Sequence, residues 1–387
     1  MKRSLKVCLA AIMLAIPLAG CWDLKDVQEV GYVTALGFDY ADGQYVVCVQ
    51  MIDFSSVAKA ELAGHGQSPV WVGIGRGETI AEAIGELHKT EQMPLFFGHV
   101  GALVMGEQLL KRKDLMVQVY EFKSRNYEIR STAWIYGTRA PLDKLFSLTS
   151  IFGGPPIMSV LHQPRESFKQ YGHVKPMTIR EFDVRLGEPA ITVLLPCLSI
   201  DSDDWRDGES RRPASFIDGA FVIENRNYRM WLSNEQLTAL PWIMPDTYTT
   251  LLELNTQSSK VVVLQLGSPK VRVTPRVRGG NAEYSLSVTM DANFFVDTTS
   301  IPEDEIERMA EEKVKREIEK LFEFSVKHDI DLLGLEEALY RKRVRDWKML
   351  KERGAHEIGE DSLKEINVDI RLKRTGKIKE RIMMESK

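Results

Sequence analysis

The residues that could do catalytic or metal chemistry are scattered along this 387-residue chain. The seven histidines lie at positions 65, 88, 99, 162, 173, 328 and 356, and none pairs with another at the spacing of helical metal ligands. H-E-x-x-H, C-x-x-C and the G-x-S-x-G elbow are all missing from the sequence. His99 enters an apolar stretch, where we expect a hydrogen-bonded core histidine. The sequence therefore predicts no enzymatic activity, cofactor or metal site.

Glycines 73, 75 and 77 form the nearest approach to a phosphate-binding loop. The third glycine falls one residue early for G-x-G-x-x-G, and no GK[ST] follows. We interpret Gly73–Gly77 as a flexible turn between a strand and a helix.

Cys21 is the residue with the most specific chemistry. Lys2, Arg3 and Lys6 precede an apolar run that is too short to cross a membrane, which is the pattern of a signal peptide over residues 1–20. The run ends in Leu18-Ala19-Gly20-Cys21, which resembles the bacterial lipobox. The resemblance implies cleavage between Gly20 and Cys21, a diacylglyceryl thioether on the Cys21 thiol and N-acylation of its new amino group. We therefore expect a lipoprotein whose folded part is held at a membrane by its acyl chains.

Composition excludes some partners and leaves the state of two cysteines open. The formal net charge is −4, and it becomes more negative without the three signal-peptide cations, which argues against a nucleic-acid partner. The 44% of hydrophobic residues is enough for sizeable cores. Cys48 and Cys197 lie in apolar, strand-like stretches, where we expect buried free thiols, with a disulfide as the alternative.

Hydrophobic periodicity predicts an α+β, multi-domain protein with mixed and antiparallel sheets and packed helices. Strands and helices alternate through an N-terminal α/β domain, residues 21–200. Charged and turn-forming residues at 201–214 indicate a linker. The C-terminal α+β region, residues 215–387, contains a meander of strands from Thr249 to Phe295, a long helix over 302–327 and a final strand, and could form two lobes.

Short motifs in order along the chain resemble the Ger(x)C family, the lipoprotein subunits of nutrient germinant receptors in endospore-forming bacteria. The fragments that carry the resemblance are Cys21-Trp22-Asp23, Ala35-Leu36-Gly37-Phe38-Asp39, Phe96-Phe97-Gly98-His99, Glu128-Ile129-Arg130 with Trp134, Trp231-Leu232-Ser233, Asp331-Leu332-Leu333-Gly334, Tyr340-Arg341-Lys342 with Trp347, Ile366–Arg371 and Thr375-Gly376. Phe38 stands where the family usually has isoleucine.

The resemblance implies a non-enzymatic subunit of a spore nutrient germinant receptor that serves receptor assembly or signal coupling. Its implied partners are the membrane and two polytopic subunits, one with a soluble domain and one similar to amino-acid transporters. Its implied place is the outer face of the cell membrane, which is the spore inner membrane in the dormant spore. The alternative is a substrate-binding lipoprotein of a membrane transporter.

Overall fold

The computed structural model describes residues 30–52, 70–150, 154–255, 261–299, 301–354 and 358–373. The expected signal peptide, Gly20, Cys21 and Thr375-Gly376 lie outside these ranges. Within them, no helix has both the length and the apolar composition needed to span a bilayer.

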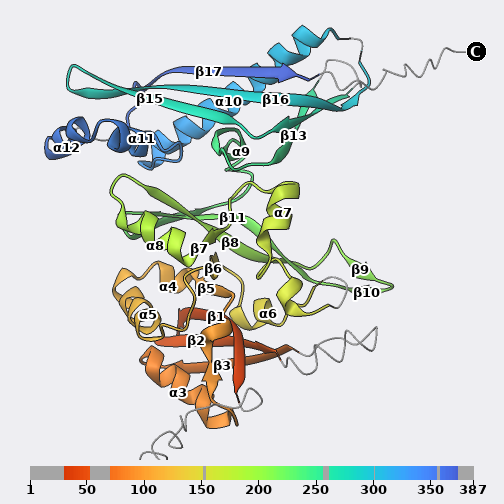
Figure 1. The fold of residues 1–387 in the computed structure, drawn as a ribbon, viewed down its shortest axis with the longest axis vertical. Helices are drawn as coiled ribbons and strands as arrows, with labels where there is room; N and C mark the ends of the chain where they lie inside the picture. The colour runs from red at the N-terminus through yellow and green to blue at the C-terminus, as the bar shows by residue number, and fades with distance from the viewer. Residues whose placement is uncertain are drawn as a thin grey trace, which may run out of the picture.

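A mixed sheet of ten strands forms one end and the middle of the molecule (Figure 1). Its order is β12-β11-β8-β6-β5-β1-β2-β3, with β4 beside β1 and β7 beside β6. Parallel pairing joins β1 to β5, β5 to β6 and β6 to β8, whereas β1–β2, β2–β3, β8–β11 and β11–β12 are antiparallel. The strands are β1 (Gly31–Ala41), β2 (Gln44–Ile52), β3 (Val70–Gly77), β4 (Leu95–Phe96), β5 (Ala102–Gly106), β6 (Trp134–Thr138), β7 (Met177–Thr178), β8 (Thr192–Asp201), β11 (Ala214–Glu224) and β12 (Asn227–Leu232).

Short helices cover this sheet. The helices are α3 (Ile80–Thr90), η3 (Phe97–His99), α4 (Glu107–Leu110), α5 (Lys113–Arg125), α6 (Leu142–Phe146), η4 (Pro156–Met158), α7 (Pro164–Tyr171) and α8 (Ile179–Gly187). In α3, Ile80, Ala83, Ile84 and Leu87 are buried, as their helical spacing predicts. Together with the mixed sheet, these helices confirm the α+β class.

The glycines at 73, 75 and 77 are part of strand β3, so the predicted flexible turn is wrong. They lie on the face of β3 that α3 covers. A Cβ atom on Gly75 would lie 1.8 Å from the Ala83 carbonyl oxygen, and one on Gly77 would lie 2.7 Å from the Ala83 nitrogen. The glycines are therefore needed because the backbone of α3 touches the backbone of β3.

Residues 201–214, expected as a linker, include a small hairpin of β9 (Arg206–Asp207) and β10 (Ser210–Arg211) between β8 and β11. Strand β11 returns to pair with β8 over most of its length. Residues on both sides of the expected linker thus share one sheet. The division into domains at this segment stays a prediction.

A second sheet forms the opposite end of the molecule (Figure 1). It contains β13 (Thr249–Asn255), β14 (Val261–Gly267), β15 (Lys270–Arg278), β16 (Asn281–Asp297) and β17 (Leu363–Leu372). Strands β14 and β15 both pair with β16, at 292–297 and 281–289. They therefore lie end to end along the long strand β16, whereas a simple meander would pair them with each other.

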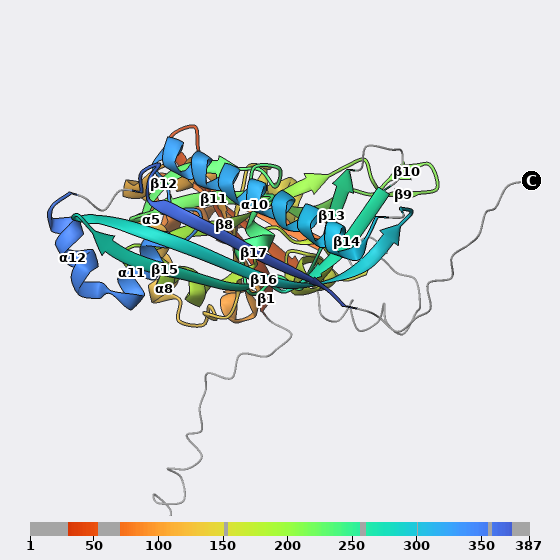
Figure 2. The same ribbon diagram turned by 90° about the horizontal axis from the view of Figure 1, so that it is seen from above.

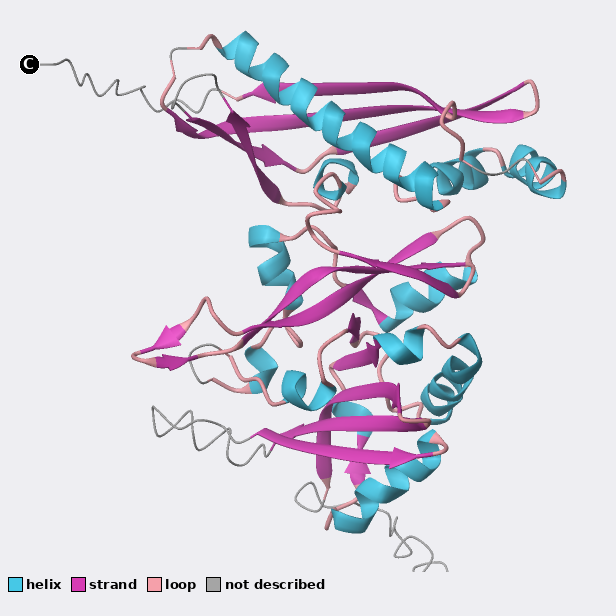
Figure 3. Cartoon of the chain, turned by 180° about the vertical axis from the view of Figure 1, so that it is seen from behind, coloured by secondary structure: helices cyan, strands magenta, loops and turns pink. Residues whose placement is uncertain are grey.

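The long helix α10 (Glu303–His328) packs on this sheet beside β17 (Figures 2 and 3). Ile306, Ala310, Val314 and Ile318 enter the core, as the apolar repeat predicts. The carboxylates of Glu307 and Glu311 accept hydrogen bonds from the backbone N–H groups of Leu372 (2.7 Å) and Ile370 (3.0 Å) in β17. Helix α10 thus satisfies donors at the outer edge of β17.

Candidate functional site: the joint between the two sheets

The segment Asp329–Gly334, which we call the joint, connects α10 to α11 (Leu335–Lys342). Asp329 ends α10 in the left-handed conformation (φ 52°). Gly334, also left-handed (φ 67°), precedes α11 but has no side chain to cap it. Asp331 takes that role, because its Oδ2 accepts a hydrogen bond from the Glu336 N–H at 2.8 Å.

A second hydrogen bond fixes α11 against α12 (Val344–Glu352). Trp347 donates its indole N–H to the Glu336 carboxylate at 2.8 Å. The Trp347 ring also meets Tyr340 edge-on, with 4.9 Å between ring centroids. Asp331, Tyr340 and Trp347, which belong to the motifs quoted above, therefore stabilise the joint and the two helices that follow it.

Trp347→Phe is expected to cost about 1.5–3 kcal/mol of unfolding free energy, because Glu336 loses a hydrogen bond to a charged acceptor. Chemical denaturation would measure this loss. Trp205, which is half exposed, supplies the control Trp205→Phe. Equal denaturation midpoints for Trp347→Phe and Trp205→Phe would contradict the role assigned to the indole N–H of Trp347.

The joint contacts the first sheet through Arg229 of β12. The guanidinium donates to the carbonyl oxygens of Asp329 (2.8 Å) and His328 (3.3 Å) at the end of α10. The same guanidinium lies 3.7 Å from Glu224 of β11. Because carbonyl oxygens at a helix C-terminus carry partial negative charge, Arg229 is well placed to hold α10 against the first sheet.

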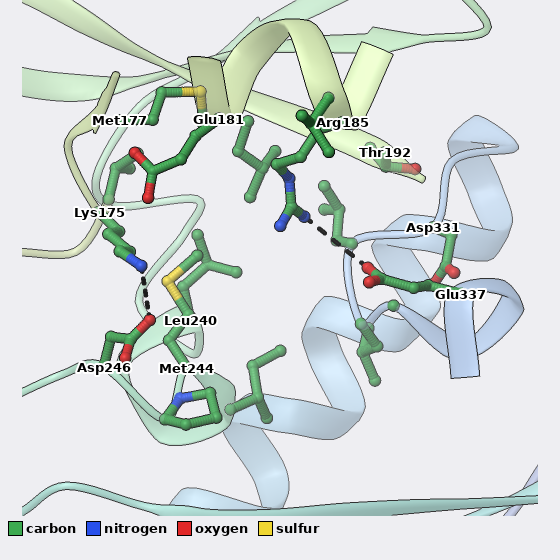
Figure 4. A pocket seen from close by; sticks show the side chains of 18 of the residues that line it. Lys175, Met177, Glu181, Arg185, Thr192, Leu240, Met244, Asp246, Asp331 and Glu337 are labelled. Atoms are coloured by element: carbon green, nitrogen blue, oxygen red, sulfur yellow. Dashed lines mark hydrogen bonds and ion pairs between the residues drawn. The ribbon is translucent and has the colours of Figure 1, made fainter. Parts of the chain in front are cut away.

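A cavity of about 590 Å³ lies beside the joint, between the two sheets (Figure 4). Two ion pairs cross it: Lys175 to Asp246 at 2.6 Å, and Arg185 to Glu337 at 3.8 Å. Its apolar lining comes from both sides and comprises Val174, Met177, Val184, Leu194, Leu240, Ile243, Met244, Pro245, Leu332 and Leu333. Charged residues also line the cavity: Lys175, Arg180, Glu181, Arg185, Asp246, Asp331 and Glu337. The volume of the cavity lies in the range of small-molecule sites, but its walls carry more charge than is usual for them.

Asp331 also lines the cavity and is the most perturbed carboxyl group there. The pKa of Asp331 is raised to about 7, chiefly by burial and in smaller part by the nearby Glu336 and Glu224, against the opposing effect of hydrogen bonds from the N–H groups of Leu335 and Glu336. Its Oδ1 has no hydrogen-bond partner among the described residues. A protonated carboxyl is favoured in such a setting because it carries no buried charge.

Two family models match most of the chain. The model "Spore germination protein N-terminal domain" covers residues 23–200, and "Spore germination B3/ GerAC like, C-terminal" covers residues 218–376. The chain belongs to the GerAC family of spore germination proteins.

Relatives and a solved structure agree with this assignment. Spore germination protein KC of Bacillus subtilis (strain 168) is 24% identical over 96% of each chain, and spore germination protein B3 of the same strain is 21% identical over 74% of each. The crystal structure of the GerBC protein has the same fold, with a TM-score of 0.54 and 14% identity over 87% of this chain and 96% of that one.

The motifs of this GerAC family member occupy structural positions. Gly98 allows the Phe96 ring to fold over it, since a Cβ atom there would lie 2.5 Å from that ring. His99 is exposed in η3, against the rings of Tyr32 and Phe96, so the expected core position is wrong. Its turn ends before the apolar strand β5 begins.

The two cysteines of the described residues are buried. Cys48 and Cys197 are free thiols, as expected, and burial raises the pKa of Cys48 to about 12.

One buried polar cluster had no signal in the sequence. Gln50 of β2 is fully buried, and its Oε1 accepts from Thr34 (3.1 Å) and lies 2.9 Å from His162 Nε2. Its Nε2 donates to the Phe146 carbonyl at 2.7 Å. Burial lowers the pKa of His162 to about 4, so this imidazole is neutral and structural. Among the described residues, no three His, Cys, Asp or Glu side chains gather as metal ligands.

Proposed function

We propose that this chain is a lipid-anchored, non-enzymatic subunit of a spore nutrient germinant receptor, needed for receptor assembly or signal coupling. The observation that carries the proposal is the match of both family models, in order, over residues 23–376, directly behind the lipobox at Cys21. Its place is the outer face of the cell membrane, the spore inner membrane in the dormant spore. Its partners there are two polytopic subunits, one with a soluble domain and one transporter-like.

The joint supports a role in coupling. Arg229, Lys175 and Arg185 connect the first sheet to the joint and to the residues around the second sheet through charged contacts. Charged contacts with exposed side chains can be exchanged at little free-energy cost, unlike a packed apolar core. The two sheets also share one apolar core, to which Leu194, Val222 and Leu232 of the first sheet contribute, so a partner that alters the charged contacts would adjust the joint without separating the sheets.

The lipid anchor is tested by Cys21→Ala, which removes the thiol that accepts the diacylglyceryl group. We expect the chain to leave the membrane fraction, and the spore response to nutrients to fall to about the level of a gene deletion. The physical reason is the loss of high local concentration beside membrane partners, which is worth about 10²–10⁴ in apparent affinity.

Cys8→Ala provides the matched control, because Cys8 lies within the apolar run and outside the lipobox. That variant should remain membrane-bound and active. Cys21→Ala spores with normal receptor levels and normal responses would show that the anchor is dispensable.

Which subunit of the receptor binds the nutrient is tested by thermal-shift measurements on the purified chain with a panel of nutrients. We propose that the transporter-like subunit binds the germinant, so the melting temperature of this chain should stay unchanged. A saturable rise at low nutrient concentration would assign binding to this chain, since a ligand stabilises the state that binds it.

The cavity beside the joint is the observation that favours the alternative, a substrate-binding lipoprotein of a transporter. Against it stands the second sheet, in which antiparallel β13–β16 are followed by one long helix, where a two-lobed binding protein would repeat βαβ units. Neighbouring genes for an ATPase and a permease would favour the transporter reading; genes for the two polytopic subunits would favour the receptor.

A further inference from the structure

One end of the first sheet exposes apolar side chains where the folded chain begins. Strand pairing places Val33, Met51 and Trp71 in one row across β1, β2 and β3. Trp71 therefore lies at the end of the sheet where β1 starts. Trp71 is 60% exposed, on a strand that has a neighbour on one side only among the described residues.

The end of α3 reaches the same place. Leu87 packs over Gly73, the next residue after Trp71 on that face of β3, so the last turn of α3 lies near the indole. Beyond it, Met93 is 42% exposed, and the Pro94 carbonyl accepts the Gly31 N–H at 3.1 Å. Lys89 in that last turn is also exposed and forms a surface ion pair with Glu86 of the same helix at 2.6 Å, which a stronger anionic surface can replace. We call Gly31, Trp71, Lys89 and Met93 the tether end.

The short distance in sequence from Cys21 to Gly31 indicates that a membrane covers the tether end. Nine residues separate Cys21 from Gly31, a stretch that spans at most about 35 Å even when fully extended. Strands β1–β3 and α3 lie at the end of the molecule opposite the second sheet, with the rest of the first sheet between them (Figure 1). A bilayer that holds Cys21 is thus within reach of the tether end.

The side chains at the tether end suit a lipid surface. Tryptophan concentrates at membrane–water interfaces, where its ring is buried among headgroups and its N–H stays hydrated. A lysine beside it can keep its ammonium group among anionic headgroups. Half-buried Tyr32 and Phe96, 5.9 Å apart and edge-on, continue the aromatic character along the start of β1.

We propose that the tether end rests in the headgroup layer of the membrane, with Trp71 and Met93 inserted and Lys89 beside anionic lipid. The proposal rests on the lipid anchor at Cys21 proposed above. The tether end would then be a second membrane contact, in addition to the anchor at Cys21. Two contacts fix the orientation of the molecule, with the β1–β3 end of the first sheet at the membrane and the second sheet directed away from it.

The test uses the full-length lipidated protein in vesicles of phosphatidylcholine and phosphatidylglycerol. An environment-sensitive thiol dye is attached to Met93→Cys, and in a separate sample to Phe295→Cys, a 61%-exposed position in β16 of the second sheet. Cys48 and Cys197 are fully buried and should not react. We expect a blue shift and at least threefold stronger quenching by headgroup-labelled nitroxide lipids at Met93 than at Phe295. Adding Trp71→Gln should weaken the quenching at Met93.

Flotation of the same vesicles separates failure of the anchor from failure of the contact. Protein that floats while its Met93 dye is quenched no more than the Phe295 dye would overturn the lipid contact and leave the anchor standing. Protein that does not float would overturn both. A Met93 dye that is shielded only after the polytopic subunits are added would assign the tether end to a protein partner, which also overturns the proposal.

Discussion

Gly75→Ala is expected to lower the free energy of unfolding by at least about 3 kcal/mol, because no neighbouring side chain can move aside. The new Cβ would lie 1.8 Å from the Ala83 carbonyl oxygen, which belongs to the α3 backbone. The whole helix must therefore move away from β3 and uncover Ile80, Ile84 and Leu87. Chemical denaturation of the purified chain, monitored by circular dichroism, would measure the effect.

Gly85→Ala is the matched control on the same helix. A Cβ atom at Gly85 meets nothing within 4 Å, so alanine should stabilise α3 by about 0.5–1 kcal/mol through its better helix propensity. We therefore expect the free energy of unfolding to fall in Gly75→Ala and to rise in Gly85→Ala. A Gly75→Ala protein as stable as the parent would mean that α3 does not lie against the backbone of β3.

Asp331→Asn is expected to change how stability depends on pH. The folded state raises the pKa of Asp331 from 3.8 to about 7, so between these values the folded chain binds more protons than the unfolded chain. The contribution of this group to stability is therefore lost as pH rises through that window, by up to about 4 kcal/mol at ~1.36 kcal/mol per pH unit. Asparagine does not titrate, so the variant should gain stability relative to the parent from about pH 4 to pH 8.

Asp331→Ala separates the charge from the cap. Asparagine keeps an oxygen that can accept the Glu336 N–H, whereas alanine has none, so Asp331→Ala should be about 1 kcal/mol less stable than Asp331→Asn at every pH. Its pH dependence should nevertheless follow that of Asp331→Asn. A stability difference between parent and Asp331→Asn that stays flat from pH 4 to pH 8 would refute the raised pKa. Urea denaturation at a series of pH values provides both measurements.

Local chemistry was enough to predict many of the elements. Asp42-Gly43 is a dipeptide typical of a tight turn, because both residues adopt the positive φ that aspartate and glycine tolerate. The apolar repeat from Ile306 to Phe322 predicts α10 to within a residue or two of its observed bounds. These features depend on side chains close together in sequence.

Features that depend on distant partners were missed. A G-x-G-x-G run has the same composition whether it makes a turn or admits a helix, and only the position of α3 decides between them. Glu311 has the spacing to pair with Lys315 on its own helix, yet its carboxylate accepts a hydrogen bond from β17. The pairing of β11 with β8 likewise involves residues on both sides of a charged hairpin.

In the candidate site, too, the features that depend on residues distant in sequence could not be predicted. The D-x-x-G block could be quoted from the sequence, but its role as a helix cap came from the distance between Asp331 and Glu336. The cavity could not be predicted, because Lys175 and Arg185 meet Asp246 and Glu337 only after the two sheets are assembled.

The parallel pairing of β17 with β16 has a consequence for biogenesis. About 65 residues separate the end of β16 from the start of β17, and α10 lies between them. A chain synthesised from its N-terminus completes β17 only after β16 and α10. Until then, the β16 edge from Tyr284 to Ala292 lacks its partner, and such an edge attracts strands of other chains. Biogenesis therefore includes a period in which the second sheet is exposed to aggregation, ending when β17 pairs with β16.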